Sequence, residues 1–292
     1  MDKEMTASQA VGKLRSGMTL GIGGWGARRK PMALIREILR SSIKDLTVVG
    51  FGGPDVGMLC AAGKVRRLVY GFVSLDFIPL EPYFRKARET GSIEVSELDE
   101  GMLVLGLRAA GMGVPFLPTP IGFGTDVLTH NPQLRTVRSP YDDGELLIAM
   151  PAIPVDVSLL HVNRADRLGN SQTDGPDPYF DDVLARAADR CFLSTEILVD
   201  RLDQLAPDTP RSNLFDRSCV AGVVATPGGA HPTSCPDVYG WDAEHIRAYA
   251  ASAGEAEGWR RYVEQWITPR ESAYQARIGG AERLGRLPLA IP

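Results

Sequence analysis

The sequence is poor in the residues that build disulfide-linked or metal-linked folds. It has four cysteines, Cys60, Cys191, Cys219 and Cys235, with no CxxC spacing. This pattern argues against a disulfide framework and a zinc site, so we expect free thiols in a reducing cytoplasm and no bound metal. A P-loop and a GxSxG nucleophile motif are also missing, which argues against the common P-loop nucleotide-binding and serine-hydrolase classes.

Basic charge and long apolar runs are scarce as well. The formal net charge is −4 and the pI is about 5.7, so nothing marks the chain as a binder of nucleic acid or anionic membranes. Residues 1–10 are too polar for a signal peptide, and no run of about 18 apolar residues predicts a transmembrane helix. The cluster Arg28, Arg29 and Lys30 is typical of a solvated surface, with capture of an anionic ligand as the alternative.

What remains is an aliphatic pattern of alternating strands and helices. Hydrophobic residues make up 44 % of the chain and aromatics only 7 %, so the core must rest on Leu, Val, Ile, Ala and Met. The alternation predicts an α/β fold with a mainly parallel open sheet flanked by helices. Strands are expected at residues 18–22, 46–49, 68–71, 93–95, 146–150, 157–161 and 220–224, and helices at 7–16, 31–39, 56–62, 82–89 and 102–110.

The pattern changes near residue 241. From there apolar residues such as Ile246, Tyr249 and Trp266 fall at helical spacing. We therefore predict an α/β domain over residues 1–240 and a helical C-terminal extension over residues 241–292, packed on the same domain. The stretches 111–125 and 173–178 are rich in Pro and Gly and are predicted to be long structured loops.

A glycine-rich loop follows the first expected strand. Gly21, Gly23 and Gly26 formally match GxGxxG, but the next helix is delayed to about Pro31 and the next strand carries no terminal carboxylate, which disfavours dinucleotide binding. Without a Cβ, Gly23 and its neighbours can bring bare N–H groups close to a ligand oxyanion. A tight turn with no ligand is the alternative.

An acidic segment lies between an expected strand and an expected helix. It contains Glu97, Asp99 and Glu100, and a carboxylate at such a junction can face a cleft while the helix N-terminus favours its ionised form. Glu97 also fits a solvent-facing strand position, and Asp99 also fits a helix N-cap. A segment that only caps the helix, with no chemistry, is the alternative.

Other polar residues support weaker predictions. His161 and His231 are expected to be hydrogen-bonded structural residues, and Asp166 with Asn170 is expected to shape a turn. Dense acids at residues 177–182 are interpreted as helix N-terminal acids, because their spacing fits no EF-hand. A polar loop containing Thr125, His130 and Asn131 is a candidate pocket lining.

Several of these segments together resemble class I CoA-transferases. Gly23, Gly24 and Trp25, followed by Pro31, resemble the N-terminal signature of that family, although Trp25 stands where the family has Phe. Residues 165–170 (ADRLGN) resemble an alpha-chain motif, and residues 227–232 (PGGAHP) resemble a loop of the glutaconate-transferase branch. The resemblance implies the family's α/β fold and a homologous beta subunit in an α2β2 heterotetramer.

The resemblance also implies a reaction. Its steroid-degrading branch contains a hydrolase that opens a ring in a cyclic β-keto acyl-CoA, with coenzyme A as part of the substrate and no separate cofactor. In that branch the glutamate of the acidic segment is the acid/base, which selects Glu100. Backbone amides around Gly23, Gly24 and Trp25 would then hold an oxyanion, and Glu97, Asp99, Arg28, Thr125 and Asn131 would line the substrate pocket.

Two other functions stay open at this point. The chain fits the alpha subunit of a genuine 3-oxoacid or glutaconate CoA-transferase, because the nucleophilic Glu of such enzymes lies in the beta subunit. It also fits a non-catalytic subunit on the same fold, since fold does not fix function.

Overall fold

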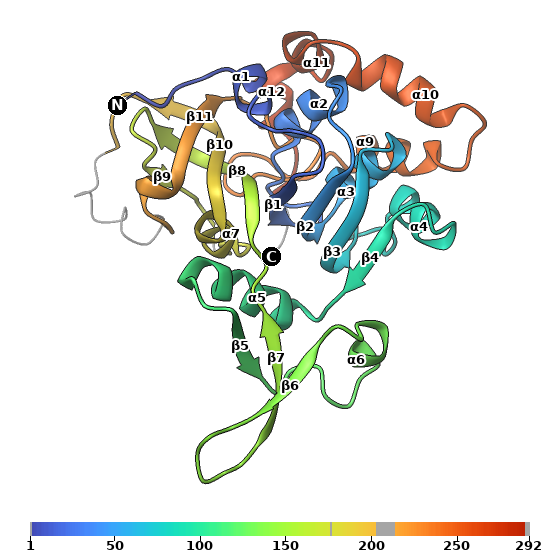
Figure 1. Ribbon diagram of the computed structural model, residues 1–292. Coiled ribbons are helices and arrows are strands. Elements are labelled where there is room, and N and C mark those ends of the chain that lie inside the picture. Colours follow the sequence, from blue (N-terminus) through green and yellow to red (C-terminus); the bar gives the residue numbers. More distant parts are fainter. Residues whose placement is uncertain (1, 176, 203–213, 290–292) are drawn as a thin grey trace.

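A parallel sheet forms the body of the molecule (Figure 1). The computed structural model describes residues 2–175, 177–202 and 214–289. All strands of the main path pair in parallel, in the order β11-β10-β8-β1-β2-β3-β4, and β9 adds to β8 antiparallel. The strands are β1 (Thr19–Trp25), β2 (Leu46–Gly52), β3 (Val65–Val73), β4 (Glu94–Glu97), β8 (Val155–Asp166), β9 (Ser171–Gln172), β10 (Ala188–Val199) and β11 (Val220–Ala225).

Helices cover both faces of this sheet, because successive strand residues point to opposite sides. Val48 of β2 joins one buried hydrophobic cluster, which includes α1, α2, α3 and α4, whereas Val49 joins a second cluster that includes α5 and α7. The predicted α/β class with a mainly parallel open sheet is therefore confirmed. The helices are α1 (Ala7–Val11), α2 (Met32–Arg40), α3 (Pro54–Ala61), α4 (Pro82–Glu89), α5 (Glu100–Met112), α6 (Val127–His130), α7 (Asp181–Ala187) and the 3₁₀ turn η1 (Arg217–Cys219).

A small antiparallel sheet extends from the body below α5 (Figure 1). It has the order β5-β7-β6, with β5 (Phe116–Thr119), β6 (Arg135–Arg138) and β7 (Leu146–Pro151). The strand expected at residues 146–150 exists but belongs to this sheet. The prediction of a loop across residues 111–125 is wrong where β5 lies, and β6 and β10 were not predicted.

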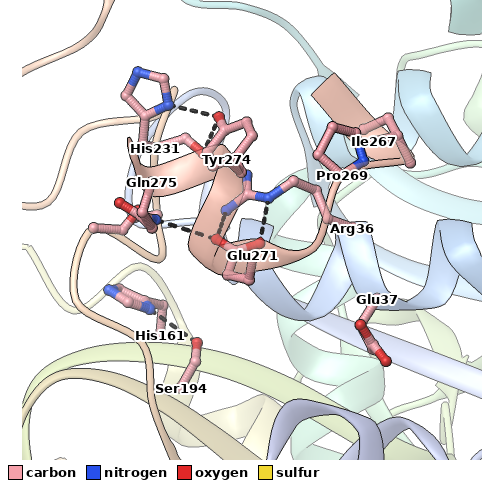
Figure 2. A network of polar contacts seen from close by, with 12 residues as sticks. Arg36, Glu37, His161, Ser194, His231, Ile267, Pro269, Glu271, Tyr274 and Gln275 are labelled. Atoms are coloured by element: carbon pink, nitrogen blue, oxygen red, sulfur yellow. Dashed lines mark hydrogen bonds and ion pairs between the residues drawn. The ribbon is translucent and has the colours of Figure 1, made fainter. Parts of the chain in front are cut away.

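The C-terminal segment is helical, as predicted. It contains α9 (Ala243–Ser252), α10 (Gly258–Tyr262), the π-helical turn η2 (Val263–Ile267), α11 (Glu271–Arg277) and α12 (Gly280–Leu284). Buried Arg36 of α2 fixes it, donating from Nε (2.9 Å) and Nη2 (2.5 Å) to the carboxylate of Glu271 (Figure 2). The Arg36 guanidinium also lies 3.7 Å from the Tyr274 ring centroid. In the described part of the chain, no helix is long and apolar enough to cross a membrane.

A buried ion pair holds the carboxyl end of β1 and the turn that follows it. The predicted glycine loop is largely wrong, because β1 continues through Gly23 and Gly24 to Trp25 and the turn begins at Gly26. The Arg29 and Asp181 side chains are both fully buried, with Nη1 and Oδ2 2.8 Å apart. Asp181 also accepts the Gly24 N–H at 3.0 Å, and Arg29 donates to the carbonyls of His161 and Pro178. The prediction that this basic cluster forms a solvated surface is wrong for Arg29, because its charge is neutralised by the first residue of α7.

Lys30 is also buried. Its Nζ lies 3.3 Å from Asp55 and donates to the carbonyl of Phe51 at 2.5 Å. Burial lowers the pKa of Lys30, and Asp55 opposes that shift. Of the three basic side chains, Arg29 and Lys30 are therefore buried in ion pairs, and only Arg28 is partly exposed to solvent.

We expect Asp181→Ala to reduce the free energy of unfolding by about 3–5 kcal/mol, because it leaves the buried Arg29 charge without a partner. Urea unfolding of the purified protein followed by circular dichroism measures the change. Glu89→Ala, which breaks the exposed Arg85–Glu89 pair on α4, is the matched control and should change stability far less. An Asp181→Ala protein as stable as the Glu89→Ala protein would contradict this assignment.

A buried carboxyl connects α4 to the C-terminal helices. Glu81 caps α4 by accepting the Phe84 N–H at 2.6 Å, and it accepts the Tyr249 hydroxyl of α9 at 2.7 Å. Burial raises the pKa of Glu81 to about 7 from an ordinary value of 4.5, and the hydrogen bonds only partly offset this. Between pH 4.5 and about 7, Glu81 therefore holds a proton in the folded chain that it releases in the unfolded chain.

Stability should therefore fall as pH rises from about 5 to 7, since the folded state binds more protons there. The loss from this group is about 3 kcal/mol. Glu81→Gln stays neutral at all pH values, so its unfolding free energy should lack this component. Urea midpoints of the two proteins at pH 5, 6, 7 and 8 test the prediction, and parallel pH curves would refute it.

Candidate active site

The acidic segment forms the start of α5. Asp99, predicted to line the substrate pocket with a helix N-cap as the alternative, is the N-cap of this helix and accepts the Gly101 N–H at 2.7 Å. Glu100 is the first helical residue. The positive end of the helix dipole therefore lies beside its carboxyl group and favours the charged form.

Glycine in β3 gives Glu100 its position. A Cβ on Gly71 would lie 3.1 Å from the Glu100 Cγ and 3.1 Å from the Phe51 ring, which is tighter than ordinary packing. The bare backbone of β3 therefore lets Glu100 lie against the carboxyl ends of β2 and β3. Ligands of open parallel sheets bind at this end of the strands.

A pocket of about 710 Å³ opens in front of Glu100. It lies between β3, the start of α5 and the loop that leads to α6. Thr125 and His130 line it, as predicted. Its lining residues are Gly71, Arg88, Glu97, Leu98, Asp99, Glu100, Gly122, Thr125, Asp126, Val127 and His130.

The environment of Glu100 changes its proton affinity. Partial burial raises the pKa of Glu100 above its ordinary value, the Trp25 side chain opposes this shift, and the negative charges of Asp99 and Asp177 add to it. A carboxyl group with a raised pKa, facing a pocket, can take up and release a proton closer to neutral pH.

The other predicted pocket residues divide into two groups. Glu97 faces the pocket but is already paired, with Arg88 at 2.5 Å and the Tyr70 hydroxyl at 3.0 Å. Asn131 does not line the pocket: its side chain is buried and its Nδ2 donates to the carbonyls of Glu97 and Val127. Asn131 thus stabilises the loop from behind.

Arg28, a predicted pocket residue, is not among the residues that line the Glu100 pocket. Its guanidinium carbon is 5.1 Å from the Trp25 ring and 5.4 Å from the Trp241 ring. Asp76 approaches it at 3.6 Å. The Arg28 side chain is therefore held by two indole rings and a carboxylate.

The backbone amides of the glycine loop have partners within the chain. The Gly24 N–H donates to Asp181, and the Trp25 N–H donates to the Arg28 carbonyl at 3.0 Å. Gly23 is required for close packing, because a Cβ there would lie 2.5 Å from Asp181. The structure thus uses the Gly24 and Trp25 amides for folding and leaves neither directed at an oxyanion.

The buried histidines are hydrogen-bonded, as predicted. His161 contacts Ser194 at 2.8 Å and Glu196 at 2.9 Å, and His231 contacts Tyr274 at 2.6 Å (Figure 2). In the described residues, two buried groups have metal-ligand side chains: His161 with Glu196 and Cys235, and His231 with Asp242 and His245. Their His and carboxylate groups are already hydrogen-bonded to neighbouring side chains, so we assign both clusters to the core.

Sequence reasoning missed two contributors to the site, the space left by Gly71 and the negative charge of Asp177. Gly71 interrupts the apolar run of β3 at its carboxyl end, which is a usable signal for close approach of another group.

Known proteins share this architecture. The subunit named cholesterol ring-cleaving hydrolase IpdA of Rhodococcus jostii (strain RHA1) is 50 % identical over 284 residues, covering 95 % of this chain and 96 % of that protein. Glutaconate coenzyme A-transferase from Acidaminococcus fermentans superposes with a TM-score of 0.89 at 27 % identity, over 99 % of this chain and 96 % of that one. A variant of the decarboxylase AibA/AibB superposes with a TM-score of 0.76 at 30 % identity, over 95 % and 99 % of the two chains.

A family model agrees with these relatives. The model described as coenzyme A transferase matches residues 4–225, which include the whole main sheet and the glycine loop. The match and the relatives together span the fold and the Glu100 pocket. The chain therefore belongs to the coenzyme A transferase family, and it is an alpha-type subunit.

Proposed function

We propose that this chain is the alpha subunit of a hydrolase that opens a carbon ring in a cyclic β-keto acyl-CoA from steroid C/D-ring degradation. The observation that carries the proposal is the 50 % identity, over nearly the whole chain, to a subunit named as a cholesterol ring-cleaving hydrolase. The position of Glu100 supports it, because this chain then supplies a proton-accepting group to its own pocket.

The proposed reaction is a retro-Claisen cleavage. Glu100 removes a proton from water, and the resulting oxygen nucleophile adds to the ring ketone. The bond between that carbonyl carbon and the carbon next to the thioester then breaks, and its electron pair forms an enolate with the thioester carbonyl. Glu100 returns its proton to the enolate carbon. The ring ketone becomes a carboxylate, its remaining proton passes to solvent, and the CoA thioester stays intact.

Three further statements belong to this proposal. The chain acts with a homologous beta subunit, because its relatives are subunits of two-subunit enzymes. An α2β2 heterotetramer is the assembly we propose, and the cytoplasm is the compartment. Coenzyme A enters as part of the substrate, with no separate cofactor or metal.

The second candidate is the alpha subunit of a genuine CoA-transferase of the 3-oxoacid or glutaconate type. The superposition on glutaconate coenzyme A-transferase, with a TM-score of 0.89, favours it. In such an enzyme a glutamate of the beta subunit attacks the thioester, and this chain supplies pocket walls. A Ser-Glu-Asn-Gly motif in the beta subunit would favour transfer over hydrolysis.

Replacing the base tests the hydrolase. With the beta subunit co-expressed, Glu100→Gln should lower kcat for ring opening by at least about 100-fold, because the amide cannot accept the proton. The assay incubates the complex with a cyclic β-keto acyl-CoA and no acceptor acid, and follows the ring-opened CoA product by mass spectrometry. Glu94→Gln, an exposed β4 residue before the same segment, is the matched control.

Each outcome has a distinct meaning. If Glu97→Gln abolishes ring opening and Glu100→Gln does not, the base is Glu97 and this assignment is wrong. If the unmodified complex forms no product by itself but exchanges CoA when succinate or acetate is added, the chain is a transferase subunit and the hydrolase proposal fails.

A further inference from the structure

The proposed reaction forms negative charge on the substrate, and the pocket offers few groups that can receive it. The ring-ketone oxygen becomes an oxyanion when water adds to its carbon, and it ends as part of a carboxylate. The Gly24 and Trp25 amides are hydrogen-bonded within the chain, and the Thr125 hydroxyl donates to the Gly122 carbonyl at 2.8 Å. A donor for this charge therefore has to be sought elsewhere in the pocket.

Two lining residues, Arg88 and His130, carry side-chain N–H groups. Among the described residues that line the pocket, Arg88 is the one with a permanent positive charge. The His130 side chain is exposed at the end of the short helix α6, and no described residue is hydrogen-bonded to its ring. Of the two, only Arg88 can therefore be held in place by the chain before a substrate arrives.

Contacts between α4, β3 and β4 hold Arg88. Its Nη2 donates to Glu97 Oε2 at 2.5 Å, and the Tyr70 hydroxyl donates to the same oxygen at 3.0 Å. Tyr70 and Glu97 are paired residues of neighbouring strands, and the Tyr70 ring meets Phe84 of α4 edge-on with centroids 5.2 Å apart. Because Phe84 lies one helical turn before Arg88, the ring contact and the ion pair fix the same helix. A donor oriented in advance does not have to reorganise during the reaction.

Most of the Arg88 guanidinium stays available to a ligand. Within the part of the chain that the structure describes, Glu97 is its one hydrogen-bond acceptor and uses only Nη2. The Arg88 and Glu97 side chains are 48 % and 45 % exposed, so the pair lies at the open wall of the pocket. The planar fork of a guanidinium matches the two oxygens of a carboxylate. Exposed ion pairs contribute little to stability, so Arg88 can be replaced without unfolding the chain.

We propose that Arg88 stabilises the negative charge that ring opening forms. Its guanidinium donates to the ring-ketone oxygen as this becomes an oxyanion, and then to the new carboxylate. No covalent bond of Arg88 forms or breaks, and Glu100 still moves the proton, while Glu97 and Tyr70 are positioning residues that hold the guanidinium. Because these donors act where charge develops, they lower the barrier more than they tighten substrate binding. This inference rests on the proposed ring-opening function.

Kinetics of Arg88→Met in the complex with the beta subunit test the inference. For ring opening of the cyclic β-keto acyl-CoA, kcat should fall about 100-fold while KM changes less than about threefold. Arg88→Lys, which keeps the charge but not the fork, should recover part of kcat. Arg85→Met is the matched control, because it removes an exposed arginine of the same helix outside the pocket lining and should keep the kcat of the unmodified complex.

The pH profile separates this role from an effect on the base. The charges that raise the pKa of Glu100 are those of Asp99 and Asp177, so Arg88→Met should lower kcat at every pH and leave the acidic limb in place. The double variant Arg88→Met, Glu97→Gln leaves no unpaired carboxylate at this wall and should show the same loss. Recovery of kcat in the double variant would assign the loss to the charge of Glu97 and overturn the proposal.

Ligand binding gives a readout that does not need turnover. In the Glu100→Gln complex, calorimetry compares the Kd of the cyclic β-keto acyl-CoA with that of its ring-opened product, which carries the new carboxylate. Adding Arg88→Met should weaken product binding about tenfold or more and substrate binding less than about twofold. Equal weakening of both ligands, or of neither, would refute the inference.

Failure of the inference can be told apart from failure of the proposed function. If the unmodified complex does not open the ring, the proposed function is wrong. If it opens the ring and Arg88→Met keeps its kcat, the inference alone is wrong. The same holds if His130→Gln shows the loss in place of Arg88→Met.

Discussion

The buried ion pair between Arg29 and Asp181 is the constraint on which the arrangement of the site depends. It connects the loop after β1 to the first residue of α7, with both charges removed from water. The same carboxylate accepts the Gly24 N–H, so the loop has one conformation. That conformation places Trp25 at the end of β1 and the Arg28 guanidinium over its ring.

The second support is the junction between β4 and α5. Asp99 caps the helix and places Glu100 in its first turn, where the helix dipole favours a carboxylate. Gly71 leaves the space that Glu100 occupies. Residues near the carboxyl ends of β2 and β3 therefore meet one helix N-terminus, and most of the side chains that line the pocket in front of them are polar or charged. This arrangement suits a base that must change its proton state in a partly dry environment.

The fold could be predicted where local patterns act alone. The predicted α4 coincides with the observed Pro82–Glu89, because Pro at its start and an amphipathic spacing define it. The strand β10 was missed because buried Ser194 and Glu196 interrupt its apolar run, and both are satisfied by His161 on the neighbouring strand β8. Such pairing across strands leaves no trace in the local sequence.

In the site, too, features set by the local sequence could be predicted, and features set by distant partners could not. Asp99 as a cap and the alignment of Glu100 with a cleft follow from the order of strand, acid and helix. Arg29 and Lys30 were assigned to the surface because their ion-pair partners, Asp181 and Asp55, lie far away in sequence. The assignment of Asn131 to the pocket was wrong for a related reason: only the fold shows that its amide is used to hold Glu97 and Val127.

In the proposed reaction, water activated in the Glu100 pocket cleaves a ring carbon–carbon bond and leaves the thioester intact. The most direct test runs the reaction of the assembled complex in H₂¹⁸O and locates the label by tandem mass spectrometry of the product. The account predicts a CoA thioester that is still intact and carries ¹⁸O in its new carboxylate. Release of free CoA without ring opening, or a ring-opened product whose new carboxylate is unlabelled, would contradict it.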